Sequence, residues 1–148
     1  MADPTTILVA ARDEEDIIGE TVTALRRAFP DAEVIVADDG SRDATAERAE
    51  AAGAAVLNLP RRGKGEALSA AERAAPPGAL LLVDADLRGD LTPLLPSDNV
   101  SQGLRIAAFA RRQGGGFGVA KAAARALIRL RSGFDAAEPL SGQRALSA

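Results

Sequence analysis

Short apolar runs alternate with helix-like segments over about the first 85 residues, and this alternation constrains the fold more than any other feature. The apolar runs lie at residues 6–10, 33–37, 54–59 and 79–83, and each has the length of a buried strand. Strands that alternate with helices build a mostly parallel sheet with right-handed crossovers and helices on both faces. We therefore predict the α/β fold class, in a single domain of 148 residues.

Helix signals lie between the predicted strands. After the first strand, apolar residues recur at spacings of four, three and four, as on one face of a helix: Ile18, Val22, Leu25 and Phe29. Asp13 precedes them, and we expect it to cap the start of that helix.

Further elements are expected later in the chain. Asp43 predicts the cap of an alanine-rich helix that ends near Gly53, and a third helix is expected over residues 66–75. Residues 104–109 predict another strand and residues 119–130 a helix, and the signal fades beyond them.

The composition excludes several kinds of chemistry. The chain has no cysteine and no histidine, so thiolate nucleophiles and an imidazole base are ruled out, and a bound metal must use oxygen ligands. The net charge of −3 argues against a nucleic-acid-binding protein. Residues 1–6 lack a secretory signal and no apolar stretch approaches about 18 residues. We therefore expect a cytoplasmic protein without a transmembrane segment, and a homodimer is compatible with the sequence.

Acidic clusters follow three of the predicted strands. They are Asp13-Glu14, Asp38-Asp39 and Asp84-Ala85-Asp86. Ligands of parallel α/β sheets bind beyond the carboxyl ends of the strands. The three clusters therefore predict a binding site at that edge of the sheet.

Asp84 and Asp86 suggest a metal site. In an extended chain their side chains would point the same way, and two carboxylates suit Mg²⁺ or Mn²⁺, which complete their shells with water and phosphate oxygens. The alternative is a strand end followed by a solvated turn.

The other polar residues also allow a structural interpretation. Asp39 suits a hydrogen bond from a nucleobase or plain turn chemistry, with Asp38 the more structural of the two. Glu14 suits the same crevice or a favourable charge at a helix N-terminus. Lys64 suits a diphosphate or a solvated basic loop. The glycines at 114–116 suit an anionic acceptor or a flexible linker.

Four segments resemble, in order and spacing, the motifs of the family 2 glycosyltransferases, which have the GT-A fold: ILVAARDEEDIIGETV, VIVADDGSRDAT, RGKGEAL and LLLVDADL. Two later segments, RRQGGGFGVAK and EPLSGQRAL, are similar to the subset that contains glucosyl-3-phosphoglycerate synthase. The resemblance implies a nucleotide-sugar-binding half at residues 1–90 and the start of an acceptor half at 104–148. The family often has Pro and Asn where this chain has Ala10 and Asp13.

The resemblance also implies roles for matching residues of the donor half. Four residues would border the nucleotide: Ala10, Ala11, Arg12 and Glu14. Asp39 would contact its base.

Further roles implied by the resemblance concern the phosphates, the metal and the acceptor. Lys64 would approach the diphosphate, and Asp84, Ala85 and Asp86 would form a DXD motif, with Asp86 as the direct ligand of Mg²⁺ or Mn²⁺. Donor sugar and acceptor would face two later segments that contain Gly114, Gly115, Gly116, Gly142 and Gln143. Family domains usually continue beyond this length, and the closer subset often supplies a histidine ligand. We therefore expect a domain that is incomplete at its C-terminus.

The leading hypothesis is a metal-dependent glycosyltransferase that moves a sugar from a UDP- or GDP-sugar to a hydroxyl acceptor. We identify no catalytic base, so inverting and retaining routes both stay open. One alternative is a donor-binding fragment without turnover. Another is a sugar-phosphate nucleotidyltransferase, which would place a glycine-rich loop after the first strand, where residues 10–14 contain no glycine.

Overall fold

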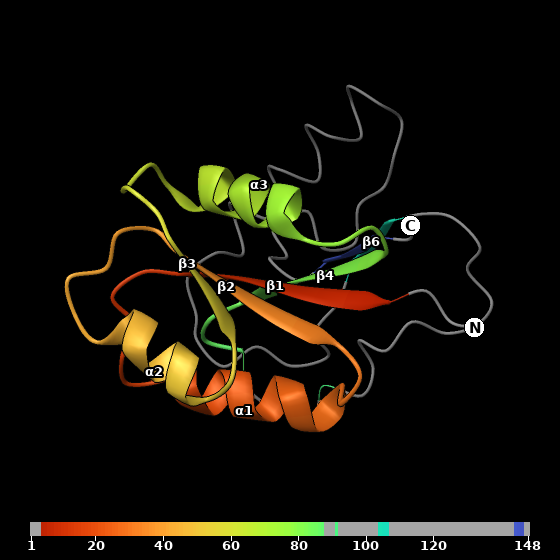
Figure 1. The fold of residues 1–148 in the computed structure, drawn as a ribbon, viewed down its shortest axis with the longest axis horizontal. Helices are drawn as coiled ribbons and strands as arrows, with labels where there is room; N and C mark the ends of the chain where they lie inside the picture. Colours follow the sequence, from red (N-terminus) through yellow and green to blue (C-terminus); the bar gives the residue numbers. More distant parts are fainter. Residues whose placement is uncertain (1–3, 88–90, 92–103, 107–143, 147–148) are drawn as a thin grey trace, which may run out of the picture.

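The computed structural model describes residues 4–87, 91, 104–106 and 144–146 (Figure 1). In chain order the elements are β1 (Thr5–Ala11), α1 (Ile18–Ala28), β2 (Glu33–Asp38), α2 (Thr45–Ala51), β3 (Ala55–Asn58), α3 (Lys64–Ala74), β4 (Ala79–Asp84), β5 (Leu104–Ile106) and β6 (Arg144–Leu146).

The strands form a six-stranded sheet in the order β3-β2-β1-β4-β6-β5. β1 pairs in parallel with β2 and β4, and β3 pairs in parallel with β2. β6 runs antiparallel to both β4 and β5. The predicted mostly parallel α/β sheet is therefore confirmed, with an antiparallel edge.

Helices cover both faces of the sheet, as predicted: α1 and α2 lie on one side and α3 on the other (Figure 1). Apolar side chains point to alternate faces of each strand. Ile7 and Val9 therefore join the core beneath α1 and α2, whereas Leu8 packs on the opposite face with Ala67 and Ala71 of α3. The α3 layer has fewer buried residues, which are Leu8, Ile35 and three alanines.

The apolar face predicted for the first helix is confirmed. Its four predicted residues are all buried: Ile18, Val22, Leu25 and Phe29. The predicted cap is wrong, because α1 begins at Ile18, five residues after Asp13, and has no side-chain cap. Asp13 instead adopts a left-handed backbone conformation, with φ of 53°, and its side chain bonds to another loop.

The remaining elements agree with the sequence to different degrees. The cap predicted at Asp43 is wrong by one residue, because Ala44 occupies the cap position of α2 and has no side-chain cap. Asp43 lies just before it and accepts the N–H of Thr45 at 3.0 Å. α3 begins two residues earlier than predicted. The strand expected at residues 104–109 is confirmed for 104–106, and its remainder and the helix expected at 119–130 lie outside the described residues. β6 was not predicted.

Candidate functional site

The sheet register brings the ends of β1, β2 and β4 together. Ala10 lies between Ala37 of β2 and Asp84 of β4, and Ala11 lies opposite Asp38. Chain segments that leave these strands therefore meet at one edge of the sheet. This edge holds the residues predicted to border a ligand.

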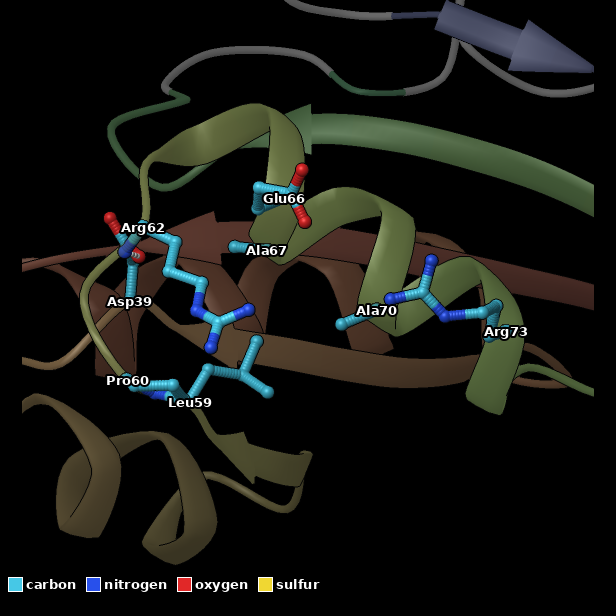
Figure 2. Close-up of a pocket in the computed structure, with 8 residues that line it drawn as sticks. All are labelled: Asp39, Leu59, Pro60, Arg62, Glu66, Ala67, Ala70 and Arg73. Carbon is cyan, nitrogen blue, oxygen red and sulfur yellow. Dashed lines mark hydrogen bonds between the residues drawn. The ribbon is translucent and has the colours of Figure 1, made fainter.

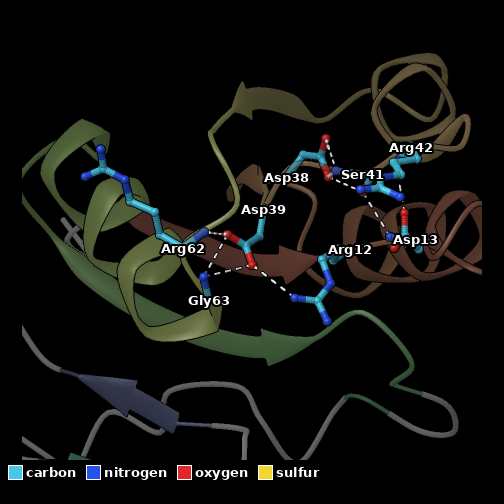
Figure 3. A network of polar contacts seen from close by, with 8 residues as sticks. All are labelled: Arg12, Asp13, Asp38, Asp39, Ser41, Arg42, Arg62 and Gly63. Atoms are coloured by element: carbon cyan, nitrogen blue, oxygen red, sulfur yellow. Dashed lines mark hydrogen bonds and ion pairs between the residues drawn. The ribbon is translucent and has the colours of Figure 1, made fainter.

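Asp39 is held in a dense set of hydrogen bonds just beyond β2 (Figure 3). Its Oδ1 accepts the N–H of Arg62 at 2.7 Å and of Gly63 at 2.9 Å, and its Oδ2 lies 3.5 Å from the Arg12 guanidinium. Only 5% of the side chain is exposed. The two backbone N–H groups hold the pKa of Asp39 below its usual value, and Arg12 and Arg61 lower it further. Asp39 is thus a buried, preformed carboxylate.

Gly63 is required at this point of the chain. Its φ of 103° lies in the left-handed region, where any side chain would be strained. This conformation directs its N–H to Asp39 and places Lys64 at the start of α3.

Asp38 has the structural role that the sequence assigned to it. Its carboxylate accepts hydrogen bonds from the backbone N–H and the hydroxyl of Ser41, which closes the turn after β2. Ser41 in turn accepts the N–H of Asp13 at 2.9 Å, and Asp13 accepts the N–H of Arg42 at 2.9 Å. Figure 3 shows how these contacts join the segment after β1 to the turn after β2.

Three more hydrogen bonds extend this connection toward α2. The N–H of Glu14 donates to Oγ1 of Thr45 at 2.8 Å, and the N–H of Glu15 donates to Asp43 at 3.1 Å. Glu15 accepts the N–H of Ala44 at 3.1 Å. We call these bonds between residues 13–15 and 41–45 the interloop clasp. They fix the backbone around Glu14.

Glu14 lies in this clasp and not on the first helix, where the sequence placed it. Its carbonyl accepts the N–H groups of Ile17 and Ile18. Burial raises the pKa of its carboxyl above the usual value, and the charges of Asp86, Asp43 and Asp13 raise it further. Glu14 therefore has acidic surroundings that include Asp86 of the cluster after the fourth strand.

The segment Asp84-Ala85-Asp86, here called the acidic turn, does not continue the strand. β4 ends at Asp84, and the N–H of Leu87 donates to the Asp84 carbonyl at 3.2 Å, so the chain turns at once. The extended geometry predicted for Asp84 and Asp86 is therefore wrong. Ala85 is buried and its carbonyl accepts the hydroxyl of Thr21 at 2.6 Å, which ties the acidic turn to α1. Asp86 is exposed.

Lys64 makes an ion pair with Oδ1 of Asp84. Lys64 is the first residue of α3, and its side chain reaches across to the end of β4. About half of the lysine side chain is exposed, against about a quarter of Asp84. The predicted basic residue and the first predicted metal ligand are thus in direct contact.

The acidic turn suits a divalent cation with few protein ligands. Among the described residues, no three acidic side chains converge to enclose a metal ion. Asp84 and Asp86 still offer hard oxygen donors on either side of Ala85 in one turn, and the charge of Asp86 raises the pKa of Glu14. Mg²⁺ binds through one or two carboxylates when phosphates and water complete its shell. The donor set therefore fits Mg²⁺ or Mn²⁺.

A cavity of about 210 Å³ lies beside Asp39, between α3 and the segment after β3 (Figure 2). Arg62, Leu59 and Pro60 line one side, and Ala67 and other α3 residues line the other. The acidic turn does not line this cavity. The site therefore has a hollow on the Asp39 side, and at the end of β4 it has the partly exposed Asp84 and the exposed Asp86.

Some functional residues were missed from the sequence, and some predicted ones lie outside the described residues. Ser41 and Thr45 belong to the segment VIVADDGSRDAT, but no role was predicted for them, and no local signal pairs Thr21 with Ala85. The predicted sugar and acceptor residues are not described by the structure: Gly114, Gly115, Gly116, Gly142 and Gln143.

The family model described as glycosyl transferase family 2 matches residues 6–90. The match covers more than half of the chain and all described residues of the candidate site. The chain therefore belongs to glycosyl transferase family 2. This membership argues against the nucleotidyltransferase alternative.

Similar proteins agree with that assignment. Glucosyl-3-phosphoglycerate synthase from Mycobacterium tuberculosis, in complex with Mn²⁺, UDP-glucose and phosphoglyceric acid, is 30% identical with a TM-score of 0.78 over 98% of this chain and 57% of that structure. A mycobacterial protein is 33% identical, with a TM-score of 0.77 over 98% of this chain and 53% of that one. Protein RfbJ of Shigella flexneri is 30% identical over 80 residues, which are 54% of this chain and 62% of RfbJ.

These likenesses establish the GT-A-like fold that the sequence predicted. The chain spans a little over half the length of the solved structures and less than two thirds of RfbJ. Within the part of the chain that the structure describes, no helix is both long and apolar enough to cross a membrane.

Proposed function

We propose that this chain binds a nucleotide-diphosphate sugar and transfers the sugar to a hydroxyl acceptor in a metal-dependent reaction. The observation that carries the proposal is the meeting of Asp39, Lys64 and Asp84 at the carboxyl edge of a parallel sheet. This edge is where such sheets bind ligands. Membership of glycosyl transferase family 2 supports the reaction class.

The Asp39 side of the site would hold the nucleoside. Asp39, Arg12 and the cavity beside α3 provide a fixed carboxylate, a cation and a hollow next to them. Two oxygens of a carboxylate offer about four acceptor positions, and the N–H groups of Arg62 and Gly63 and the Arg12 guanidinium already use them. A base N–H would therefore replace the Arg12 contact at Oδ2, which is the longest of the set. Ala10 and Ala11 would line the nucleotide with small side chains.

The acidic turn would hold Mg²⁺ or Mn²⁺ through Asp86 and Asp84. A bound divalent ion offsets charge on the departing diphosphate. Lys64 supplies a second positive charge next to Asp84, and the charge of Asp86 raises the pKa of Glu14 in the interloop clasp. Structures of the mycobacterial synthase contain Mn²⁺ together with UDP or UDP-glucose, which supports this assignment.

The acceptor side rests on the sequence alone. The glycines Gly114, Gly115, Gly116 and Gly142, with Gln143, are proposed to face sugar and acceptor. No described residue is assigned as a catalytic base, so the proposal names neither an inverting nor a retaining route.

A donor-binding unit without turnover is the second candidate. It is favoured by the position of every described site residue between Ala10 and Asp86, within the matched segment 6–90. Donor hydrolysis and transfer by the 148-residue chain separate the two candidates. Turnover with a UDP- or GDP-sugar supports the transferase, and saturable donor binding without either reaction supports the binding unit.

Thermal unfolding in the presence of UDP or GDP, with and without Mn²⁺, tests the donor site itself. A ligand at 100 times its dissociation constant adds about 2.7 kcal/mol to the free energy of unfolding. We expect a rise in melting temperature that requires both nucleotide and metal. No metal-dependent shift with either nucleotide would overturn the proposal.

A further inference from the structure

The contact between Lys64 and Asp84 has a consequence for the order in which ligands bind. Lys64 Nζ lies on Oδ1 of Asp84, one of the two carboxylates proposed to hold the metal. An ammonium group and a metal ion compete for the same carboxylate because both are positive and both need its oxygens. In this structure the lysine ammonium occupies Oδ1 of Asp84.

The side chain of Lys64 can leave Asp84 as well as pair with it. It stands at the first position of α3, after the left-handed Gly63, and 53% of its side chain is exposed. A flexible four-carbon stem lets its ammonium reach different partners without movement of the helix. Asp39 holds Gly63 by two hydrogen bonds, so the base of the lysine stays fixed while its tip is free to swing.

A diphosphate offers Lys64 a second partner. Its oxygens are strong acceptors for an ammonium with three donors. When the lysine turns toward phosphate, it frees the contacted oxygen of Asp84 for a cation. Nucleotide and metal then favour each other, and linkage requires the effect to be equal in both directions.

We propose that Lys64 pairs with Asp84 in place of the metal and leaves Asp84 only when a diphosphate is bound. Metal binding then depends on nucleotide. This inference rests on the donor site of the proposed function. It assigns to Lys64 an ordering role that goes beyond simple attraction of phosphate.

Mn²⁺ binding in the absence of nucleotide tests the inference. Free Mn²⁺ can be measured by its paramagnetic resonance signal, which suits a chain without Trp or Tyr. Lys64→Met should bind Mn²⁺ about fivefold or more tightly than the wild type, because the lysine ammonium then no longer competes for the contacted oxygen of Asp84. The same variant should bind UDP more weakly, and UDP should no longer enhance Mn²⁺ binding.

Two further variants make the result specific. Arg27→Met removes an equal charge from an exposed position near the end of α1 and should leave Mn²⁺ affinity unchanged. In the background of Asp84→Asn, Lys64→Met should no longer raise Mn²⁺ affinity, because the shared carboxylate is gone. Circular dichroism confirms that each variant is folded.

The outcomes separate this inference from the proposed function. If the wild type binds Mn²⁺ and UDP cooperatively and Lys64→Met does so equally well, the ordering role is overturned and the donor site stands. If neither protein binds UDP under any condition, the proposed function fails. Even if neither protein binds UDP, the ordering role is overturned when Lys64→Met binds Mn²⁺ no more tightly than the wild type.

Discussion

Two corners of the site satisfy their carboxylates in different ways. Asp39 is buried and accepts backbone N–H groups of Arg62 and Gly63, which cannot leave without a change of fold. Asp84 and Asp86 lie on a turn at the end of β4, where one meets a lysine side chain and the other is exposed. The difference teaches that the proposed nucleoside side is prearranged by the backbone, whereas the proposed metal side is arranged by side chains that a ligand can rearrange.

The largest effect on this comparison is expected from Asp86→Asn. The change is nearly isosteric but removes a metal-binding charge, so Mn²⁺-dependent affinity for UDP should fall on the order of 100-fold, about 2.8 kcal/mol of binding free energy. Isothermal titration with and without Mn²⁺ measures it. Asp31→Asn, at an exposed position in the loop before β2, is the matched control and should bind as the wild type does. Unchanged binding in Asp86→Asn would move the metal role elsewhere.

The second prediction breaks the tie between the acidic turn and α1. Thr21→Val removes the hydroxyl that donates to the buried Ala85 carbonyl. Leaving that carbonyl unpaired should lower the free energy of unfolding by about 1–3 kcal/mol, measured by urea unfolding followed by circular dichroism. Thr23→Val, which removes an exposed hydroxyl bond to Gly19 on the same helix, should change it by less than about 0.5 kcal/mol. Equal losses in both variants would contradict a special role for the buried bond.

A smaller effect is expected at the interloop clasp. Thr45→Val removes the acceptor of the Glu14 N–H, and we expect a loss of about 1 kcal/mol because that group is only partly buried. Thr45→Ser keeps the hydroxyl and should retain the hydrogen bond. Hydrogen exchange of the Glu14 amide should speed up in the valine variant and not in the serine variant. If exchange is equally slow in both, the clasp does not hold Glu14.

The smallest effect is expected in the pH dependence of the free energy of unfolding. The pKa of Asp39 is lowered below 3.8 in the fold, so its stabilising contribution is complete above 3.8 and is lost as the pH falls through the folded value. The pKa of Glu14 is raised above 4.5, so its contribution is complete below 4.5 and is lost as the pH rises through the folded value. Asp39 and Glu14 should thus respond to acid with opposite sign.

Unfolding free energies measured from neutral pH to below 3.8 check this expectation. Asp39→Asn should flatten the acid limb of the curve, and Glu14→Gln should flatten the limb above 4.5. A curve for Glu14→Gln that is parallel to that of the wild type would show that its carboxyl does not feel Asp86.

Local patterns were enough to predict most of the described fold. Apolar runs placed β1 to β4 within one or two residues, since a buried parallel strand is apolar on both faces. β6 was missed because its pairing with β4 joins segments that are far apart in the sequence. The early start assigned to α1 was wrong because Asp13 bonds to Ser41 and Arg42, which local propensity cannot reveal.

The candidate site was predicted in its members more than in its geometry. Asp39 and Asp84 were named from strand ends and Lys64 from a basic, glycine-containing loop, and the structure brings them to one edge. The extended arrangement of Asp84 and Asp86 failed because the chain turns after β4. The backbone partners of Asp39 lie more than twenty residues away in sequence, so their bonds are a product of the fold alone.

The small side chains beneath α3 determine how closely this helix packs on the sheet, and so where Lys64 lies. Ala67 and Ala71 press the helix against Leu8 and Ile35 with little between them but methyl groups. A close-packed layer cannot absorb added methylenes without shifting its neighbours. A larger residue at position 71 would move α3 away from the sheet and Lys64 away from Asp84. The small side chain of Ala71, seven residues after Lys64, therefore helps to keep the lysine within contact distance of Asp84.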